Sequence, residues 1–343
     1  MRYGVEELNP ADDILLDKIV MESPVRLVKL QDIDQSEGPY CMSFGFSLKP
    51  LVHSIRNVGL VNSLLAIEKC DGSLTLFAGY RRLKALKILK WAEVPCRVFS
   101  ESQVSPFQCL LINLNDNLVT RTLNEVEKGM VLSRLIPFLP KPRIIRHFMP
   151  LIGLPSHEAT FLSYVRLAEE MDEEGKSCLV QGRISMETAR AIIEMDRSSG
   201  PHLFGLISKL RLNMNQQKQL IEYITELANI ERKSIDDLFK EYSFEAIYSD
   251  ACLNRPQKAK AILTFLRARR YPSLAGAEDT FHRMVSRLEL PDDVRISFPP
   301  FFEAPHYRIE VSFREGKELK EKLKLLSHTE GLEGLGDPWR NSD

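Results

Sequence analysis

The spacing of apolar residues changes along the chain and predicts a small mixed domain, a long helical region and a short mixed segment at the end. Strand-like runs near the start are "PVRLVKLQDI" from Pro24, "VNSLLAIEK" from Val61 and "LTLFA" from Leu74. The last two flank Asp71-Gly72, a pair that is typical of hairpin turns. This order predicts a β-hairpin within the first domain.

Two helices and one more strand complete that first domain. The segment "LKPLVHSIRNVGL" has apolar residues at helical spacing and is expected to end at Gly59. A second helix is expected after Gly79 through about Lys90, and "EVPCRVF" is expected to form the next strand. The pattern predicts an α+β unit of about a hundred residues, which is a normal size for one domain.

The following region has helical spacing almost throughout. Asn124 is expected to cap one helix, with Glu127 three positions later in the capping box. A helix-turn-helix pattern comes next, with the turn at 152–155 and Ser156 as the predicted N-cap. Ser185 is expected to cap a later helix. More helices are predicted from Leu203 to about Leu290, with breaks near Asn213, Ser234, Pro256 and Pro272.

The last segment contains two alternating strands, "DDVRISF" and "HYRIEVSF", followed by the helix "EGKELKEKLKLL". These strands are expected either to pair with a second copy of the chain or to pack on the helix before Leu290. We therefore predict an α+β chain that is predominantly helical. The predicted divisions are an N-terminal arm (1–22), an α+β domain (23–121), a helix-turn-helix domain (122–200), a helical region (201–291), a β-β-α unit (292–327) and a flexible tail (328–343).

Composition restricts the function classes. The chain has 46 Lys and Arg against 47 Asp and Glu, so any contact with nucleic acid must come from a local patch. Its six cysteines form no C-x-x-C pair and complete no zinc pattern. The start lacks the pattern of a signal peptide, and no run approaches the roughly 18 apolar residues of a membrane span. We expect a cytoplasmic protein that does not bind membranes.

The stretch "FAGYRRL" places two arginines directly after the strand-to-helix turn at Gly79. A helix N-terminus favours anions, and the guanidinium groups of Arg81 and Arg82 can bind phosphate oxygens in pairs. This arrangement predicts an anion site at the turn. The alternative is that both arginines are solvated or paired with Glu68 or Glu93.

Several motifs in the same order resemble the ParB partition-protein family. They cover roughly Pro24 to Asp196. The matching residues are Ser54-Ile55, Gly59-Leu60, Gly79, Arg81-Arg82, Ala85 and Val94-Pro95, then Asp116-Asn117-Leu118, Leu123-Asn124 and Glu127, then Gly182, Ile184-Ser185 and Ala189-Arg190. The resemblance implies a ParB/sulfiredoxin-like α+β domain followed by a degenerate helix-turn-helix.

The resemblance also implies ligands and partners. Gly79, Arg81, Arg82 and Asn117 would hold the phosphates of CTP or another nucleoside triphosphate, and Asp116 and Asn117 would lie near Mg²⁺. The alternative for Asp116 and Asn117 is a helix-surface pair with no partner and no role in binding. The family would further imply DNA binding, a homodimer, a ParA-type ATPase as partner, and association with the nucleoid or a plasmid.

The sequence departs from the family at two positions. Tyr80 replaces a glutamate, so at most weak CTPase activity is expected, and whether the chain is an enzyme stays open. Thr120 stands where the family has an arginine, and Arg121 follows one position late. Because a helix rotates by about 100° per residue, Arg121 is expected to point elsewhere.

Contact with DNA is predicted for two helices. The first carries Lys141, Arg143 and Arg146, which suit phosphate, and the second offers His157, Ser163 and Arg166 as candidates for base edges. The alternative is a packing module that has lost specific DNA recognition. The run "RARR" at 267–270 is interpreted as a phosphate contact or as a solvated helix end.

The predicted function is a ParB-like, CTP-responsive DNA-binding protein in plasmid or chromosome partition or in transcriptional regulation. Two alternatives stay open. One is an enzyme on the same fold, either a nuclease or a phosphotransferase, which would need an acid or nucleophile near Gly79. The other is a scaffold that binds nucleotide and no longer recognises a DNA sequence.

Overall fold

The computed structural model describes residues 23–34, 36–195, 199–304 and 306–339. Contacts between Cα atoms divide the chain into two compact units, Met1–Lys209 and Leu210–Asp343, which we call unit 1 and unit 2. The predicted arm at 1–22 lies outside the described residues. None of the described helices is both long enough and apolar enough to cross a bilayer.

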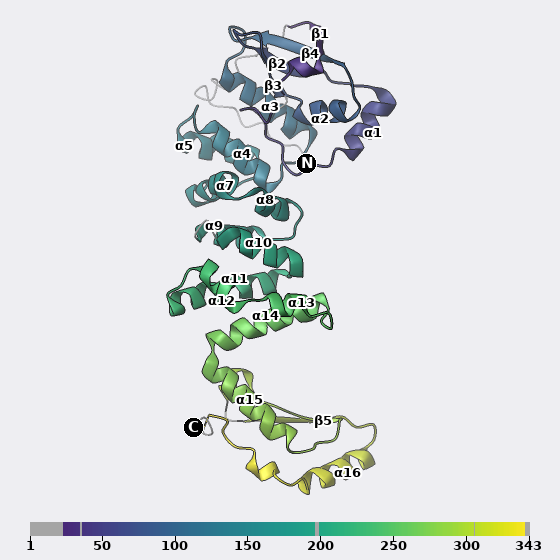
Figure 1. Cartoon of the computed structure of the whole chain (residues 1–343), viewed down its shortest axis with the longest axis vertical. Helices are drawn as coiled ribbons and strands as arrows, with labels where there is room; N and C mark the ends of the chain where they lie inside the picture. The colour runs from purple at the N-terminus through teal and green to yellow at the C-terminus, as the bar shows by residue number, and fades with distance from the viewer. Residues whose placement is uncertain (1–22, 35, 196–198, 305, 340–343) are drawn as a thin grey trace, which may run out of the picture. The chain divides into compact units, whose positions relative to one another are not determined.

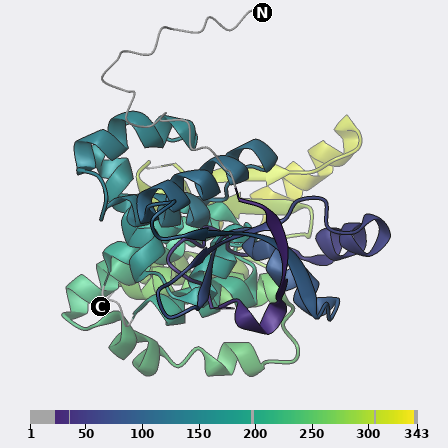
Figure 2. The same ribbon diagram turned by 90° about the horizontal axis from the view of Figure 1, so that it is seen from above.

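Unit 1 begins with a four-stranded sheet in the order β1-β4-β2-β3. The predicted hairpin is confirmed, because β2 and β3 pair antiparallel, while β2 and β4 are parallel. Figures 1 and 2 show α1 beside the sheet, toward the outside of the unit. The elements are β1 (Val25–Lys29), α1 (Lys49–Val58), β2 (Leu64–Glu68), β3 (Leu74–Ala78), α2 (Tyr80–Ile88), β4 (Glu93–Ser100) and α3 (Pro106–Thr120), with a 3-10 turn at Leu30–Asp32.

The rest of unit 1 is helical. The capping box of Asn124 and Glu127 is confirmed, and so is the cap at Ser185, whose hydroxyl accepts from the N–H of Thr188. The helices are α4 (Glu125–Leu135), α5 (Lys141–Arg143), a π-helical turn (Ile144–Phe148), α6 (Met149–Leu151), α7 (Glu158–Glu170), α8 (Glu173–Val180), α9 (Met186–Glu194) and α10 (Ser199–Leu210).

One predicted cap in this region is wrong. The N-cap of α7 is His157, not Ser156, and no side chain caps the helix. The reason lies in the turn itself, because the N–H of His157 bonds to the carbonyl of Pro155 at 2.8 Å. The first bond within the helix then runs from the N–H of Phe161 to the carbonyl of His157.

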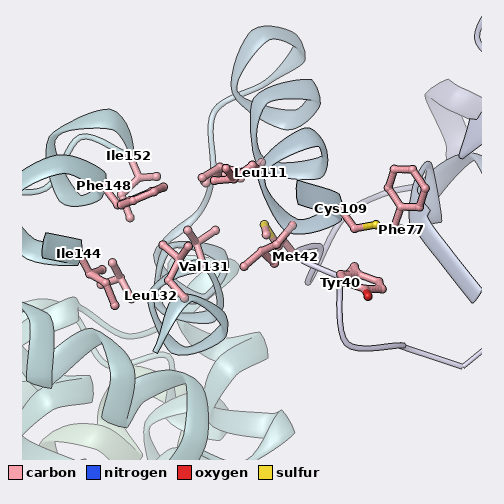
Figure 3. Close-up of a cluster of buried hydrophobic side chains, with 14 of the residues drawn as sticks. Tyr40, Met42, Phe77, Cys109, Leu111, Val131, Leu132, Ile144, Phe148 and Ile152 are labelled. Atoms are coloured by element: carbon pink, nitrogen blue, oxygen red, sulfur yellow. The ribbon is translucent and has the colours of Figure 1, made fainter. Parts of the chain in front are cut away.

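A continuous apolar cluster joins the sheet to these helices (Figure 3). Phe77 on β3, Leu111 on α3 and Val131 on α4 belong to it, and all three are buried. Helices α4 and α7 approach closely at Gly129, where an added Cβ would overlap the backbone oxygen of Tyr164. This packing fixes α3 and α4 against the sheet, so the start of α2 and the end of α3 form one corner.

Unit 2 contains five helices, two strands and a final helix among its described residues. The predicted breaks are confirmed, since Asn213 and Ser234 are N-caps and the two prolines lie at helix starts. The elements are α11 (Met214–Glu231), α12 (Ile235–Tyr242), α13 (Glu245–Ser249), α14 (Arg255–Arg270), α15 (Pro272–Ser286), β5 (Val294–Ser297), β6 (Arg308–Val311) and α16 (Gly316–Ser327), with 3-10 turns at Pro300–Phe302 and Leu332–Gly334.

Strands β5 and β6 pair antiparallel, and aromatic residues next to both strands pack on α15. The ring of Phe281 on α15 lies 5.0 Å from the rings of both Phe298 and Tyr307, measured between centroids. The segment that follows α16 also makes contacts, because the hydroxyl of Tyr307 donates to the carbonyl of Gly336 at 2.8 Å. The predicted fold class, α+β and predominantly helical, is confirmed.

Candidate functional site

The turn from β3 into α2 depends on Gly79. Its φ of 101° lies in the left-handed region, and an added Cβ would stand 2.7 Å from Leu64 Cδ2 and 3.3 Å from Arg82 Nε. Glycine is therefore required both for the backbone conformation and for the close approach. No side chain caps α2 at this position, so the first N–H groups of the helix are free of capping partners.

A cavity of about 460 Å³ opens at this turn. The structure brings all five predicted nucleotide and metal residues into its wall: Gly79, Arg81, Arg82, Asp116 and Asn117. Loop residues Met42 and Ser43 and the side chain of Arg121 complete the polar part of the wall. The volume falls within the range of small-molecule sites in proteins, which is about 300–1,000 Å³.

Among the arginines that line the cavity, Arg81 has unused hydrogen-bonding capacity. Its Nε is buried and has no hydrogen-bond acceptor, and no carboxylate among the described residues forms an ion pair with its guanidinium. The group lies over the ring of Phe46, with Cζ 4.8 Å from the centroid. Burial, followed by repulsion from Arg121, lowers the pKa of Arg81 from its ordinary value. An anion in the cavity would supply the missing acceptor and relieve that repulsion.

Arg82, in contrast, makes hydrogen bonds within the protein through both of its terminal nitrogens. Its Nη2 donates to Asp116 on α3 at 2.9 Å, and its Nη1 donates to the carbonyls of Asn62 and Ser63 at 3.1 Å each. Glu68 and Glu93 do not pair with Arg82, so the alternative in which Arg82 pairs with one of these glutamates is wrong. Arg82 ties the start of α2 to α3 and to the loop before β2.

Arg121 points into the cavity, so the predicted orientation is wrong. Helix α3 ends at Thr120, and Arg121 is extended, with φ −163° and ψ 164°, so helical rotation does not apply to it. Its Nε donates to Asn117 Oδ1 at 2.8 Å, and its Nη2 donates to the carbonyl of Met42 and the hydroxyl of Ser43 at 3.1 Å each. The capping box that starts α4 was the sequence signal for this early helix end.

A buried carboxylate holds Arg121 in place. Glu127, whose side chain is 2% exposed, pairs with Arg121 Nη1. The same carboxylate accepts from the N–H of Phe44 and from the N–H of Asn124, each at 3.0 Å. The loop that carries Ser43 is thereby fixed to the junction of α3 and α4.

Tyr80 does not place an acid in the cavity. Its hydroxyl donates to Glu37 at 3.0 Å, and Lys84 approaches the same carboxylate at 3.4 Å. Burial is the main cause that raises the pKa of Tyr80 above its ordinary value. The hydroxyl of Tyr80 is therefore bound to Glu37, in the loop between β1 and α1.

The residues predicted to hold Mg²⁺ do not fit a cation that the protein itself retains. Asp116 is paired with Arg82, and the amide oxygen of Asn117 accepts from Arg121. The interpretation of both residues as a surface pair with no partner is therefore wrong. Across the part of the chain that the structure describes, no cluster of three or more His, Cys, Asp or Glu side chains could hold a metal ion.

The predicted DNA-contacting residues lie on the segment from α5 to α6 and on α7. Two of them are engaged within the protein: Lys141 pairs with Glu158 at 2.5 Å, and Arg166 donates to Glu170 and to the carbonyl of Ile193. Arg146 and His157 are exposed, whereas Arg143 and Ser163 are half-buried. Arg143 and Arg146 form no ion pair with any residue in the described ranges.

Comparison with known proteins gives a consistent set of similarities. A family model described as the ParB N-terminal domain matches residues 18–114. The probable chromosome-partitioning protein ParB of Vibrio cholerae is 23% identical over 176 residues, which cover 51% of this chain and 57% of that protein. The nucleoid occlusion protein of Geobacillus thermodenitrificans is 25% identical over 174 residues, which cover 50% of this chain and 58% of that protein.

Two solved structures also match. The C-terminally truncated chromosome-partitioning protein ParB of Caulobacter crescentus complexed with CTP-γ-S has a TM-score of 0.26 and 22% identity, over 54% of this chain and 98% of that one. The same protein complexed to the centromeric parS site has a TM-score of 0.32 and 20% identity, over 57% of this chain and 98% of that one. The chain spans about three-fifths of the length of the curated relatives it matches.

Proposed function

We propose that this chain is a nucleotide-responsive DNA-binding protein. The premise is that residues 18–114 carry the N-terminal domain of the ParB-type partition proteins. A nucleoside triphosphate, with CTP as the first candidate, binds in the cavity at Gly79. DNA binds along the segment from α5 to α7. The cellular role is partition of a plasmid or chromosome, or regulation of transcription, in association with the nucleoid.

The observation that supports nucleotide binding is the state of Arg81. A buried guanidinium nitrogen without an acceptor is costly in a folded protein, and this one lines a cavity next to the uncapped start of α2. Helix N–H groups and a free guanidinium together form a phosphate site. The neighbouring arginines keep the walls of the cavity in place.

Calorimetric titration of the full chain tests this proposal. CTP, ATP, GTP and inorganic triphosphate are titrated separately, and we expect heat from at least one nucleotide at micromolar to millimolar concentration. The exposed Arg56 on α1, which does not line the cavity, provides the control variant Arg56→Gln with unchanged affinity. Folded protein that gives no heat with any of the four ligands would refute nucleotide binding.

Binding to DNA is proposed for Arg143 and Arg146, which form no ion pair with any residue that the structure describes. Arg143 and Arg146 lie on the helix before the turn, where contact with phosphate gives affinity without sequence information. We expect the double change to Gln to weaken DNA binding and to flatten its salt dependence by about one to two units of the log–log slope. Fluorescence anisotropy at several salt concentrations measures both effects, and a wild-type chain that binds no DNA at low salt would contradict the proposal.

A scaffold without DNA recognition is the second candidate, because α7 is poorly suited to read bases. Its exposed face carries Leu162, which is 45% exposed, and its Arg166 is occupied by Glu170. This scaffold would bind nucleotide but show the same weak affinity for every DNA sequence. Competition between a pool of specific sites and random DNA separates the two candidates.

We further propose that two copies of the chain form a homodimer through unit 2. Strand β6 exposes Ile309, and Phe313 after it is 50% exposed. Because an isolated pair of strands is only marginally stable in water, these apolar side chains are suited to contact a second copy. We expect the change of both residues to Glu to convert a dimer into a monomer in light scattering. A monomeric wild-type chain would contradict the dimer, and a ParA-type partner stays a prediction.

A further inference from the structure

We propose that the cavity binds its polyphosphate without a divalent cation held by the protein, and that Asp116 and Asn117 serve to position arginines. This inference rests on the proposed nucleotide binding and concerns the chemistry of the same site. It departs from what the family resemblance implies for these two residues. Three observations on the contacts of the described residues carry it.

The first observation is the pairing of Asp116. Its Oδ2 lies 2.9 Å from Arg82 Nη2, and the side chain of Arg82 is only 17% exposed. Arg82 also supports the carbonyls of Asn62 and Ser63. If Asp116 turned toward a metal ion, a largely buried guanidinium would lose its only carboxylate, which is strongly unfavourable. Asp116 therefore fixes Arg82, and through it the loop before β2.

The second observation is the orientation of Asn117. Its Nδ2 donates to the carbonyl of Asn113 at 2.8 Å and to the amide oxygen of Asn113 at 2.7 Å. Both donations determine which end of the amide is the nitrogen, so the oxygen faces Arg121 Nε at 2.8 Å. A divalent cation on that oxygen would stand beside a guanidinium and be repelled by it.

The third observation is the charge of the wall. The charged groups that line the cavity are three arginines and one aspartate. Asp116 pairs with Arg82 and the buried Glu127 pairs with Arg121, so among these described residues the guanidinium of Arg81 is the uncompensated charge. Arg81 has no carboxylate partner among the described residues and is free to meet a phosphate. The free guanidinium of Arg81 therefore supplies positive charge to the cavity and can bind phosphate oxygens directly.

The first test compares CTP binding to the full chain in excess EDTA and in excess Mg²⁺ by calorimetry. We expect dissociation constants that agree within about threefold. Binding that appears only with Mg²⁺, or that is more than about tenfold tighter with it, would overturn the inference while leaving nucleotide binding intact. No heat in either buffer would overturn both proposals together.

The second test uses Asp116→Asn, which keeps a hydrogen bond to Arg82 and removes one negative charge near the phosphates. We expect CTP affinity that is unchanged or up to about tenfold higher in both buffers, because repulsion of the anion falls. A metal ligand predicts the opposite, a loss of more than about tenfold in Mg²⁺. Glu93→Gln, at the exposed start of β4, is the matched control and should change nothing.

A third measurement needs no nucleotide. Mn²⁺ alone is titrated into the full chain and followed by the loss of its free electron paramagnetic resonance signal. We expect no binding below about millimolar concentration, because no described group of carboxylates or imidazoles converges on a point. A site of micromolar affinity that Asp116→Asn removes would refute the inference.

Discussion

Two arginine-rich helix ends, one in each unit, differ in whether their guanidinium groups have partners within the protein. At the start of α2, Arg81 has a buried Nε without an acceptor. At the end of α14, every arginine of the run at 267–270 pairs with a glutamate on a neighbouring helix. The partners are Glu278 for Arg267, Glu231 and Glu241 for Arg269, and Glu226 for Arg270.

The comparison shows that a basic run indicates a ligand only where its partners are missing. In unit 2 the run lies at the end of α14, where its arginines pair with glutamates and join α14 to α11, α12 and α15. A phosphate contact at this run stays a prediction. In unit 1, Arg82 and Arg121 are likewise paired with carboxylates and join neighbouring elements. Of the described arginines that line the cavity, only Arg81 has a guanidinium group without a carboxylate partner.

The largest expected effect follows from breaking the buried pair in unit 1. Glu127→Ala removes the carboxylate of Arg121 and the acceptor of two backbone N–H groups. We expect the free energy of unfolding to fall by about 3–5 kcal/mol, the usual cost of leaving one member of a buried ion pair. Chemical denaturation measures it, with Glu93→Ala as the exposed control. A loss below about 1 kcal/mol would mean that Arg121 is not held as the structure shows.

The next effect concerns Arg81, and it should appear in binding and not in stability. Arg81→Gln removes the free guanidinium, so we expect CTP affinity to fall by about 100-fold, roughly 2.7 kcal/mol. The free energy of unfolding should stay within about 0.5 kcal/mol of the wild type, since no ion pair among the described residues is lost. Equal affinities in calorimetry would remove the distinction between Arg81 and the paired arginines.

Much of the scaffold could be predicted because its signals are local. The hairpin at Asp71-Gly72, the cap at Ser185 and the capping box at Asn124 each lie within a few residues of their effect. The turn at Gly79 was predicted for the same reason. These features need only backbone conformation and short-range hydrogen bonds.

The contacts that give the cavity its character could not be predicted in this way. Arg82 and Asp116 are 34 positions apart, and Ser43 reaches Arg121 from a position 78 residues earlier. Such pairs form only after β3, α3 and the early loop have packed together. The expected orientation of Arg121 failed for a local reason, because α3 ends one residue before it.

A smaller effect is expected from a paired arginine of unit 2. Arg267 makes two bonds with Glu278, at 2.7 and 2.8 Å, and the two side chains are 34% and 17% exposed. Arg267→Gln should reduce the free energy of unfolding by about 1 kcal/mol, the upper range for a partly exposed pair. Arg255→Gln, at the exposed start of α14, is the control for denaturation. A change in CTP affinity would contradict the division of roles between the two runs.

The smallest effect is expected at Arg269, because its pairs are the most exposed. Its own side chain is 44% exposed, and the distances to Glu231 and Glu241 are 3.3 and 3.2 Å. Arg269→Gln should cost roughly 0.3 kcal/mol in dilute salt. In 1 M NaCl, where the Debye length is about 3 Å, that difference should vanish, whereas the loss at Glu127 should persist because its carboxylate is buried. If the cost at Arg269 survived high salt, the guanidinium would act mainly by packing on the ring of Tyr242, whose centroid is 5.1 Å from its Cζ.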